Sequence, residues 1–387
     1  MKIELSENAE VLLKILSDNG FSGYAVGGCV RDIMMNRQPY DFDITTDASV
    51  GEMLKIFSDF HCLTQGAKHG TVAVIVNKET VECTTYRVDG EYSDGRHPDS
   101  VMFSPRLSDD LSRRDFTINA LAYNKSDGLI DLFGGISDIE RKIIRAIGDP
   151  DRRFKEDALR IMRAIRFSSV LGFTIEKDTA ESMIRNADRL ALISKERITS
   201  ELEKTLVGEN VEYVLENFGE VFNKIIPGIV INKAGVQKVK RCPREYDIRL
   251  FALVSEFAAP LEAFENSRVI LKKSDKRLIS SLSNMPKPKD RTDIKRLLSK
   301  FGEAAVGKYV EYSGSDRLSD ELSSVLKSGE CFDISHIEIN GEKLAELGFI
   351  GKDIRKAEEE ILEEIICGRL KNNESSILEY LKGRNRQ

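Results

Sequence analysis

Asp41 and Asp43 follow a glycine pair in the segment GGCVRDIMMNRQPYDFDITT. If the YDFDIT stretch forms a strand, side chains two residues apart point to the same face. Two carboxylates on one face can hold two divalent metal ions about 4 Å apart, which is the arrangement that promotes in-line displacement at phosphorus. A DxD pair alone also occurs in solvated turns and by chance, so the residues before it decide the interpretation.

Gly27, Gly28 and Arg31 precede the aspartates in the order GGxVRD–x8–DxD. Glycine lets the backbone approach a phosphate closely, and a guanidinium presents a planar fork that suits phosphate oxygens. We expect the N–H groups of both glycines to contact a triphosphate at the start of a helix. We expect Asp32 to pair with a nearby arginine and leave it out of the site. This order of residues predicts a nucleoside triphosphate held against two metal ions.

The motifs resemble the nucleotidyltransferase superfamily that includes DNA polymerase beta. Within it, the chain is similar to class II tRNA nucleotidyltransferases, the family of CCA-adding enzymes and bacterial poly(A) polymerases. The resemblance runs in order through residues 20–206. The further segments that carry it are QGAKHGTVAVIV from Gln65, RVDGEYSDGRHPDSV from Arg87, DLSRRDFTINALAY from Asp110, DLFGGISDI from Asp131, RRFKEDALRIMRAIRFS from Arg152 and ISKERITSELEK from Ile193.

The resemblance implies two-metal nucleotidyl transfer with Mg²⁺ as the cofactor. Asp41 and Asp43 are then the catalytic and metal-binding residues. The residues expected to bind the nucleotide are Gly28, Arg31, Arg114, Asp115, Asp157, Arg160, Arg163 and Arg166. Glu82, in the VECTTY stretch, is either a third carboxylate near the metals or an exposed strand residue, and the sequence leaves both open.

By the same resemblance, Arg114 contacts the triphosphate and Asp115 lies near the ribose, with structural capping by Asp115 as the alternative. Asp157 and Arg160 would be neighbours on one helix. A carboxylate only accepts hydrogen bonds and a guanidinium only donates them. The pair could therefore bind the amino group and ring nitrogen that cytosine and adenine share, and reject uracil and guanine. An ordinary i,i+3 ion pair is the alternative.

Hydrophobic periodicity predicts an α+β fold: a small mixed-sheet head of the DNA polymerase beta type, followed by helical parts. A helix is expected over residues 5–18, with Val11 among its apolar positions, and the β-branched runs largely vanish near residue 150. We expect a catalytic head at 1–150, a helical neck for nucleotide recognition at 151–215, a helical body for RNA binding at 216–329 and a helical tail for tRNA binding at 330–387.

Composition agrees with a protein of the cytoplasm. The 387 residues carry a formal net charge of −6. No run of about 20 apolar residues predicts a membrane span, and MKIELSENAE lacks the apolar core of a signal peptide. Six scattered cysteines without a CxxC pair predict buried, reduced thiols. The expected partners are the tRNA 3′ end, with CTP and ATP as substrates; no membrane and no protein partner are indicated.

The expected activity is addition of C, C and A to the tRNA 3′ end without a nucleic-acid template. Bacterial poly(A) polymerases of this family typically carry a GRRF-type stretch and a long basic tail, whereas QGAKHGT and KGRNRQ stand here. Enzymes that add only CC tend to lack the loop signature present as YSDGRHPDS, which includes Asp94, Arg96 and His97. Addition of A alone, or a catalytically silent RNA-binding relative, stays open as an alternative.

Deletion of residues 92–99 should leave CC addition largely intact and impair addition of the final A. The physical reason is that the loop would help the pocket reshape for the larger base. Primer extension on tRNA lacking CCA measures both steps. An equal loss of both steps would mean that the loop has a structural role only.

Overall fold

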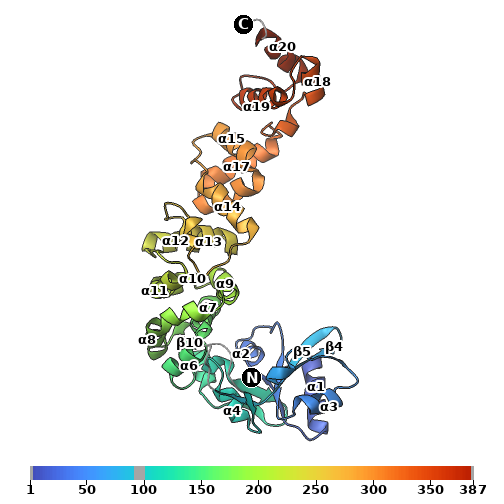
Figure 1. Ribbon diagram of the computed structural model, residues 1–387, viewed down its shortest axis with the longest axis vertical. Coiled ribbons are helices and arrows are strands. Elements are labelled where there is room, and N and C mark those ends of the chain that lie inside the picture. Colours follow the sequence, from blue (N-terminus) through green and yellow to red (C-terminus); the bar gives the residue numbers. More distant parts are fainter. Residues whose placement is uncertain (1–2, 91–100, 385–387) are drawn as a thin grey trace. The chain divides into compact units, whose positions relative to one another are not determined.

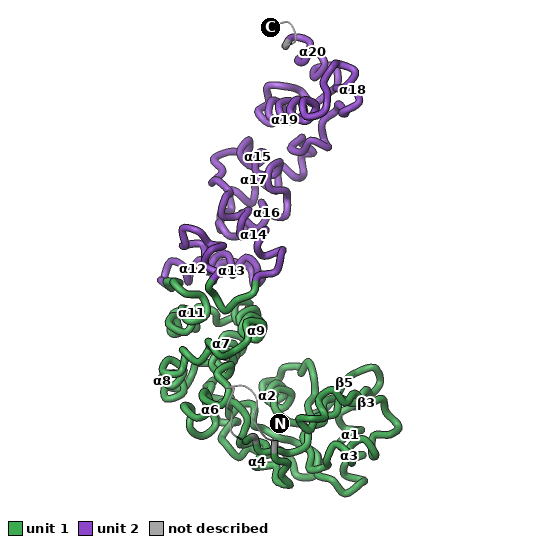
Figure 2. The backbone as a smooth tube through the Cα atoms, viewed as in Figure 1, with its two compact units in different colours: residues 1–231, 266–270 green, residues 232–265, 271–387 purple. Residues whose placement is uncertain are grey.

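The computed structural model describes residues 3–90 and 101–384 (Figure 1). The chain divides into two compact units, Met1–Ile231 with Asn266–Ile270, and Asn232–Glu265 with Leu271–Gln387 (Figure 2). Each unit has hydrophobic clusters of its own. The division into four domains stays a prediction.

Unit 1 contains the strands and the first helices. The strands are β1 (Gly23–Val26), β2 (Asp43–Thr46), β3 (His61–Leu63), β4 (Thr71–Val76), β5 (Glu79–Thr85), β6 (Arg87–Asp89), β7 (Val101–Phe103), β8 (Leu121–Asn124), β9 (Gly128–Asp131), β10 (Ile143–Ile144) and β11 (Thr174–Ile175). The helices are α1 (Glu7–Asp18), α2 (Gly28–Met34), α3 (Val50–Ile56), α4 (Leu107–Ser112), α5 (Gly135–Glu140), α6 (Pro150–Glu156), α7 (Leu159–Leu171), α8 (Lys177–Asn186), α9 (Lys195–Leu206), α10 (Val211–Asn217) and α11 (Gly219–Ile225). Short 3-10 helices span Ala67–His69, Thr117–Asn119 and Ala187–Leu192.

Among the described residues of unit 1, seven strands form one sheet in the order β3-β4-β5-β2-β1-β8-β9. The β2–β5 pair is parallel and the other pairs are antiparallel. The predicted mixed sheet is therefore confirmed. β11 is an exception to the helical pattern expected beyond residue 150, because it pairs in parallel with β10.

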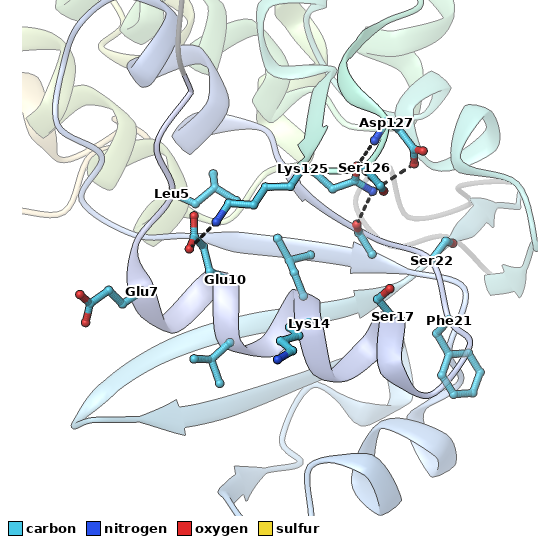
Figure 3. A pocket seen from close by; sticks show the side chains of 14 residues that line it. Leu5, Glu7, Glu10, Lys14, Ser17, Phe21, Ser22, Lys125, Ser126 and Asp127 are labelled. Carbon is cyan, nitrogen blue, oxygen red and sulfur yellow. Dashed lines mark hydrogen bonds and ion pairs between the residues drawn. The ribbon is translucent and has the colours of Figure 1, made fainter.

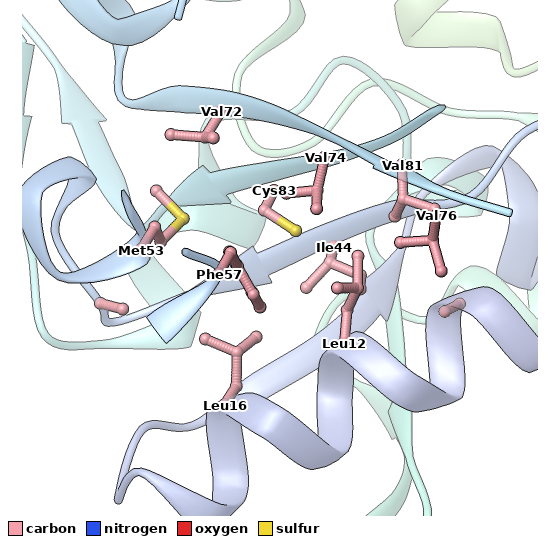
Figure 4. Close-up of a cluster of buried hydrophobic side chains, with 12 residues drawn as sticks. Leu12, Leu16, Ile44, Met53, Phe57, Val72, Val74, Val76, Val81 and Cys83 are labelled. Atoms are coloured by element: carbon pink, nitrogen blue, oxygen red, sulfur yellow. The ribbon is translucent and has the colours of Figure 1, made fainter. Parts of the chain in front are cut away.

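Helix α1 covers one face of the sheet. Ser6 caps its N-terminus by accepting a hydrogen bond from the Ala9 N–H, as expected for a serine at this position. Leu12 and Leu16, one turn apart, are fully buried. They point toward Ile44, Cys83 and the valines of β4 (Figure 4). Val11, in contrast, is 41% exposed. The prediction that Val11 belongs to the apolar face of this helix was therefore wrong.

The strand register places the carboxylates on the opposite face of the sheet. Ala25 pairs with Ile44. Ile44 packs in a hydrophobic cluster with residues of α1, and Ala25 packs in a cluster with residues of α2. Because adjacent residues alternate between faces, Asp43, which pairs with Val26, lies on the other face. Strand β2 begins only at Asp43, so the predicted strand is shorter than YDFDIT.

Unit 2 is helical in its described residues. Its helices are α12 (Lys233–Arg241), α13 (Tyr246–Val254), α14 (Lys273–Ser283), α15 (Arg291–Phe301), α16 (Glu303–Ser313), α17 (Asp316–Ser328), α18 (Gly341–Glu346), α19 (Lys352–Ile366) and α20 (Glu374–Arg384), with 3-10 turns at Glu262–Phe264 and Ile334–His336. The last three helices, α18, α19 and α20, share one hydrophobic cluster, to which they contribute the buried side chains Leu344, Ile361 and Ile377. The side chain of Arg296 on α15 bonds to Glu363 on α19, which joins this cluster to the helices before it.

The six cysteines are free thiols in the structure. Four are buried as expected, whereas Cys62 and Cys367 are half-buried. Within the described ranges, the helices are too short or too polar to cross a membrane.

Candidate active site

Three carboxylates gather on the sheet face opposite α1. Asp43 and Glu82 are direct partners in the parallel β2–β5 pair, and Asp41 lies just before β2; all three side chains are exposed. Desolvation by surrounding protein, then the charges of Asp41 and Glu82, raise the pKa of Asp43 to about 6, and Arg114 opposes this shift. Glu82 is thus both an exposed strand residue and part of the carboxylate cluster.

The glycine turn lies beside Arg114. Gly27 has φ +80°, a conformation that favours glycine. A Cβ at Gly27 would lie 2.9 Å from the Arg114 Nη1 atom. The Gly27 N–H donates to the Leu121 carbonyl at 3.1 Å, so the expected donation from this N–H to a triphosphate was wrong. Gly28 is the first residue of α2, where a helix leaves its N–H unbonded by the helix itself.

Arg114 is a cation between the glycine turn and the carboxylates. Its Nη2 atom lies 3.2 Å from the fully buried Asp110 carboxylate, which also accepts hydrogen bonds from Arg113 and Thr45. Burial alone would raise the pKa of Asp110, but Arg114 and Arg113 hold it below its usual range. The Arg114 Nε atom is buried without a hydrogen-bond partner among the described residues. A buried donor of this kind is suited to an anion.

Arg31 is held on both sides of its guanidinium group. Its Nε and Nη2 atoms bond to Asp32 at 2.9 and 2.7 Å, which confirms the expected structural role of Asp32. Its Nη1 atom donates to the Asn119 side-chain oxygen at 2.7 Å. Arg31 is only 8% exposed, so these contacts fix its orientation.

Asp115 uses both carboxylate oxygens inside the protein. One oxygen accepts from the Phe116 N–H at 2.8 Å and the Asn119 amide at 3.1 Å. The other accepts from Arg163 Nε at 2.8 Å and lies 2.7 Å from its Nη2. Burial would raise the pKa of Asp115, but Arg163 and the hydrogen bond from Asn119 hold it at about 2. The structural alternative for this residue is therefore well supported.

One aromatic ring gathers three of the predicted arginines. The guanidinium carbons of Arg31, Arg163 and Arg166 lie 5.1, 5.2 and 4.2 Å from the centroid of the Phe167 ring. Arg166 also lies 2.8 Å from the Glu201 carboxylate on α9. Phe167 and Glu201 were not among the predicted site residues, although both lie in segments that carry the family resemblance.

Asp157 does not lie on the expected helix. α6 ends before it, Asp157 itself is extended with φ −140° and ψ 104°, and α7 begins at Leu159. One carboxylate oxygen accepts the Leu159 N–H at 2.9 Å, and the other accepts from Arg197 at 3.0 Å. Arg197 stands in the ISKERITSELEK segment and was not among the predicted site residues.

Arg160 is anchored away from Asp157. Its Nη1 atom donates to Glu156 at 2.7 Å, and its Nη2 atom donates to the Arg113 carbonyl at 3.0 Å. The ordinary ion pair between Asp157 and Arg160 is therefore not formed among the contacts that the structure describes. Each of the two side chains is oriented by another partner.

The structure brings most predicted site residues of unit 1 into one network, from the carboxylates through Arg114 to the arginines of α7. The loop residues Asp94, Arg96 and His97 lie outside the described residues. A cavity of about 670 Å³ lies elsewhere in this unit, between α1 and the β8–β9 connection. The ion pair between Lys125 and Glu10 spans it at 2.8 Å (Figure 3). No predicted site residue lines this cavity.

Two family models match unit 1. Residues 23–145 match the poly(A) polymerase head domain, and residues 172–227 match the probable RNA and SrmB-binding site of polymerase A. The head match contains the carboxylates, the glycine turn and Arg114. The second match begins just after α7.

Known proteins are similar to this chain in sequence and in fold. A CCA-adding enzyme of Oceanobacillus iheyensis is 46% identical over 54% of this chain and 52% of its own length. The solved structure of the Bacillus stearothermophilus CCA-adding enzyme in complex with CTP has a TM-score of 0.78 at 30% identity, covering 98% of this chain and 97% of that one. The CCA-adding enzyme of Geobacillus stearothermophilus is 33% identical over 97% of this chain and 96% of its own. This full-length similarity shows that the chain belongs to the family of CCA-adding enzymes, which are nucleotidyltransferases.

Proposed function

We propose that this protein adds C, C and A to the 3′ end of tRNA from CTP and ATP, without a nucleic-acid template. The observation that carries the proposal is the carboxylate cluster facing Arg114 and the glycine turn, in a chain similar over its full length to CCA-adding enzymes. Because tRNA is the substrate, we expect the protein to act in the cytoplasm.

The carboxylate cluster suits a divalent metal ion, on which nucleotidyltransferases generally depend, and we propose Mg²⁺. Asp41, Asp43 and Glu82 offer only oxygen ligands, which Mg²⁺ prefers. Desolvation, and then the charges of Asp41 and Glu82, raise the pKa of Asp43, and a bound cation would relieve the repulsion among the three carboxylates. The described residues contain no preformed group of three metal-binding side chains, and triphosphate oxygens and water would complete the coordination. When bound, the metal would activate the primer hydroxyl and stabilise the leaving pyrophosphate.

The triphosphate would lie along the arginines. Arg114 offers its unpartnered, buried Nε–H beside the glycine turn, and Gly28 offers the first N–H of α2. Arg31, Arg163 and Arg166 add positive charge from the Phe167 side. These fixed charges would neutralise the phosphates and orient them for in-line attack.

The ribose would lie near Asp115. The Oδ2 atom of Asp115 accepts a hydrogen bond from the guanidinium of Arg163, and a carboxylate oxygen can accept more than one hydrogen bond. We propose that Asp115 acts chiefly by holding Arg163 in place, and that a 2′-hydroxyl would be a further donor to the same oxygen.

The base would be selected by Asp157 and Arg160. Arg197 holds the carboxylate of Asp157, and Glu156 holds the guanidinium of Arg160, so neither side chain depends on the other for its orientation. Asp157 would accept from the amino group of cytosine or adenine, and Arg160 would donate to the ring nitrogen beside it. Uracil and guanine reverse this pattern and would leave both partners unsatisfied, at about 1–3 kcal/mol each.

In the absence of divalent metal, Asp43→Asn should raise the melting temperature at pH 7.5 by about 1–2 °C, because the charge is exposed and screened. The folded-state pKa of about 6 exceeds the ordinary value of 3.8. The charged carboxylate therefore destabilises the fold above pH 6, and this effect disappears as the pH falls toward 4. Thermal unfolding in EDTA at pH 7.5 and 4.5 measures both effects.

Added Mg²⁺ should stabilise the wild-type protein more than the Asp43→Asn variant. Asp127→Asn is the control: hydrogen bonds from Tyr24 and Asn124 lower the pKa of Asp127, so this change should not stabilise the fold. If Asp43→Asn is less stable than wild type in EDTA at pH 7.5, the charged Asp43 carboxylate does not destabilise the fold, and the prediction is wrong.

Asp41→Asn or Asp43→Asn should slow nucleotide addition by about three orders of magnitude and leave tRNA affinity within about twofold, because the carboxylates hold metal and not RNA. Primer extension and filter binding would be compared on tRNA lacking CCA. Asp59→Asn, an exposed aspartate of the same unit, is the matched control. Near-normal addition by either site variant would refute the two-metal assignment.

Asp157→Ala and Arg160→Ala should each lower incorporation of CTP and ATP and relax discrimination against UTP and GTP by about tenfold or more. Arg163→Ala should lower activity with less effect on discrimination. The control is Arg152→Ala, since this 71% exposed side chain also pairs with Glu156. The measurement is relative incorporation of the four nucleotides. Wild-type selectivity in both alanine variants would remove the base-selecting role.

A further inference from the structure

Phe167 lies where the elements of the site meet. It stands on α7 and is 7% exposed. Its ring makes an edge-to-face contact with Phe116, with centroids 5.9 Å apart and planes at 83°. Three guanidinium groups lie within 5.2 Å of its centroid. Two of them, Arg163 and Arg166, belong to α7, and the third, Arg31, belongs to α2.

The electrostatic repulsion among the three guanidinium groups must be offset by other interactions. Like charges repel, and the repulsion is stronger where water is excluded. Each guanidinium has a carboxylate partner of its own: Asp32 for Arg31, Asp115 for Arg163 and Glu201 for Arg166. Asp115 is linked to Arg31 only indirectly, through the side chain of Asn119. Among the contacts that the structure describes, none of the three carboxylates directly contacts all three arginines.

The ring is the contact that all three share. The face of an aromatic ring carries a negative quadrupole and attracts a cation within about 6 Å. The attraction is stronger where water is excluded, as it is around this buried ring. A buried aliphatic side chain of similar size would fill the space without this attraction.

We propose that Phe167 is a positioning residue for the triphosphate, because its ring holds Arg31, Arg163 and Arg166 together before the nucleotide arrives. This inference rests on the proposed function. The part of the ligand concerned is the polyphosphate, which CTP and ATP share. Loss of the ring should therefore weaken both nucleotides equally and leave base selection unchanged.

A purely structural role for Phe167 makes a different prediction. A buried phenylalanine that only fills space would affect stability, and would affect binding no more than another buried phenylalanine does. Phe173, two residues past the end of α7, is 1% exposed and has no cation over its ring among the described residues. Phe173→Leu is therefore the matched control for lost aromatic volume.

The test compares Phe167→Leu, Phe167→Tyr and Phe173→Leu by calorimetric binding of inorganic tripolyphosphate, CTP and ATP. Phe167→Leu should raise the Kd for all three by about tenfold and raise the KM for both nucleotides more than it lowers kcat. Phe167→Tyr keeps the ring face and should stay within about threefold of wild type, as should Phe173→Leu. Normal polyphosphate binding by Phe167→Leu, or an equal loss in the tyrosine variant, would overturn the proposal.

A second measurement decides the matter if the leucine variant does not fold. Phenylalanine at position 167 is replaced by mono-, di- and trifluorinated phenylalanine, which keep the ring shape and progressively weaken its negative face. The Kd for tripolyphosphate should rise with each fluorine, and the absence of a trend would overturn the proposal. A wild-type protein that binds tripolyphosphate but adds no nucleotide to tRNA would refute the proposed function and leave this positioning role untouched.

Discussion

The ion pair between the buried Asp115 and the half-buried Arg163 joins the segment after α4 to the middle of α7. Through Asn119 the same carboxylate is linked to Arg31 at the start of α2. Removal of Arg163 would leave the charge of the buried Asp115 carboxylate uncompensated, which is destabilising. This one carboxylate therefore helps to fix Arg163 directly and Arg31 through Asn119.

Charge is distributed unequally across the site. On the arginine side, every cation that contacts the Phe167 ring has a carboxylate partner. On the sheet side, Asp41, Asp43 and Glu82 lie together, and the charge of Arg114 opposes the rise in the pKa of Asp43 that Asp41 and Glu82 cause. In the proposed function, a bound divalent cation would relieve the repulsion among the carboxylates, and the phosphates would be further partners for the arginines.

Much of the head could be predicted from local sequence. The alternating β-branched runs and the glycine pair predicted the strands, the turn and the start of α2, since these features depend on neighbouring residues alone. Side-chain alternation predicted that Asp41 and Asp43 share a face, although β2 begins only at Asp43. The sequence left the place of Glu82 open, and only the strand pairing shows it beside Asp43.

Contacts between distant segments were not predictable in this way. The three-residue spacing from Asp157 suggested one helix, but Asp157 is extended and bonds to Arg197 on α9, forty residues away. The N–H of Gly27 is used by the carbonyl of Leu121, a pairing that only the sheet order reveals. In the sequence, Phe167 looks like an ordinary residue of the hydrophobic core. Its proposed role depends on a contact with Arg31, which belongs to another helix, α2.

The most direct test of the central claim uses the wild-type protein and three tRNA substrates, which end before CCA, after C and after CC. Each nucleotide is supplied alone and with the others, and the products are resolved to single-nucleotide length. The account predicts addition of two C residues from CTP, then one A from ATP, and no further extension. Failure to extend any substrate, extension of the CC-ending tRNA only, or a long A tail would contradict it.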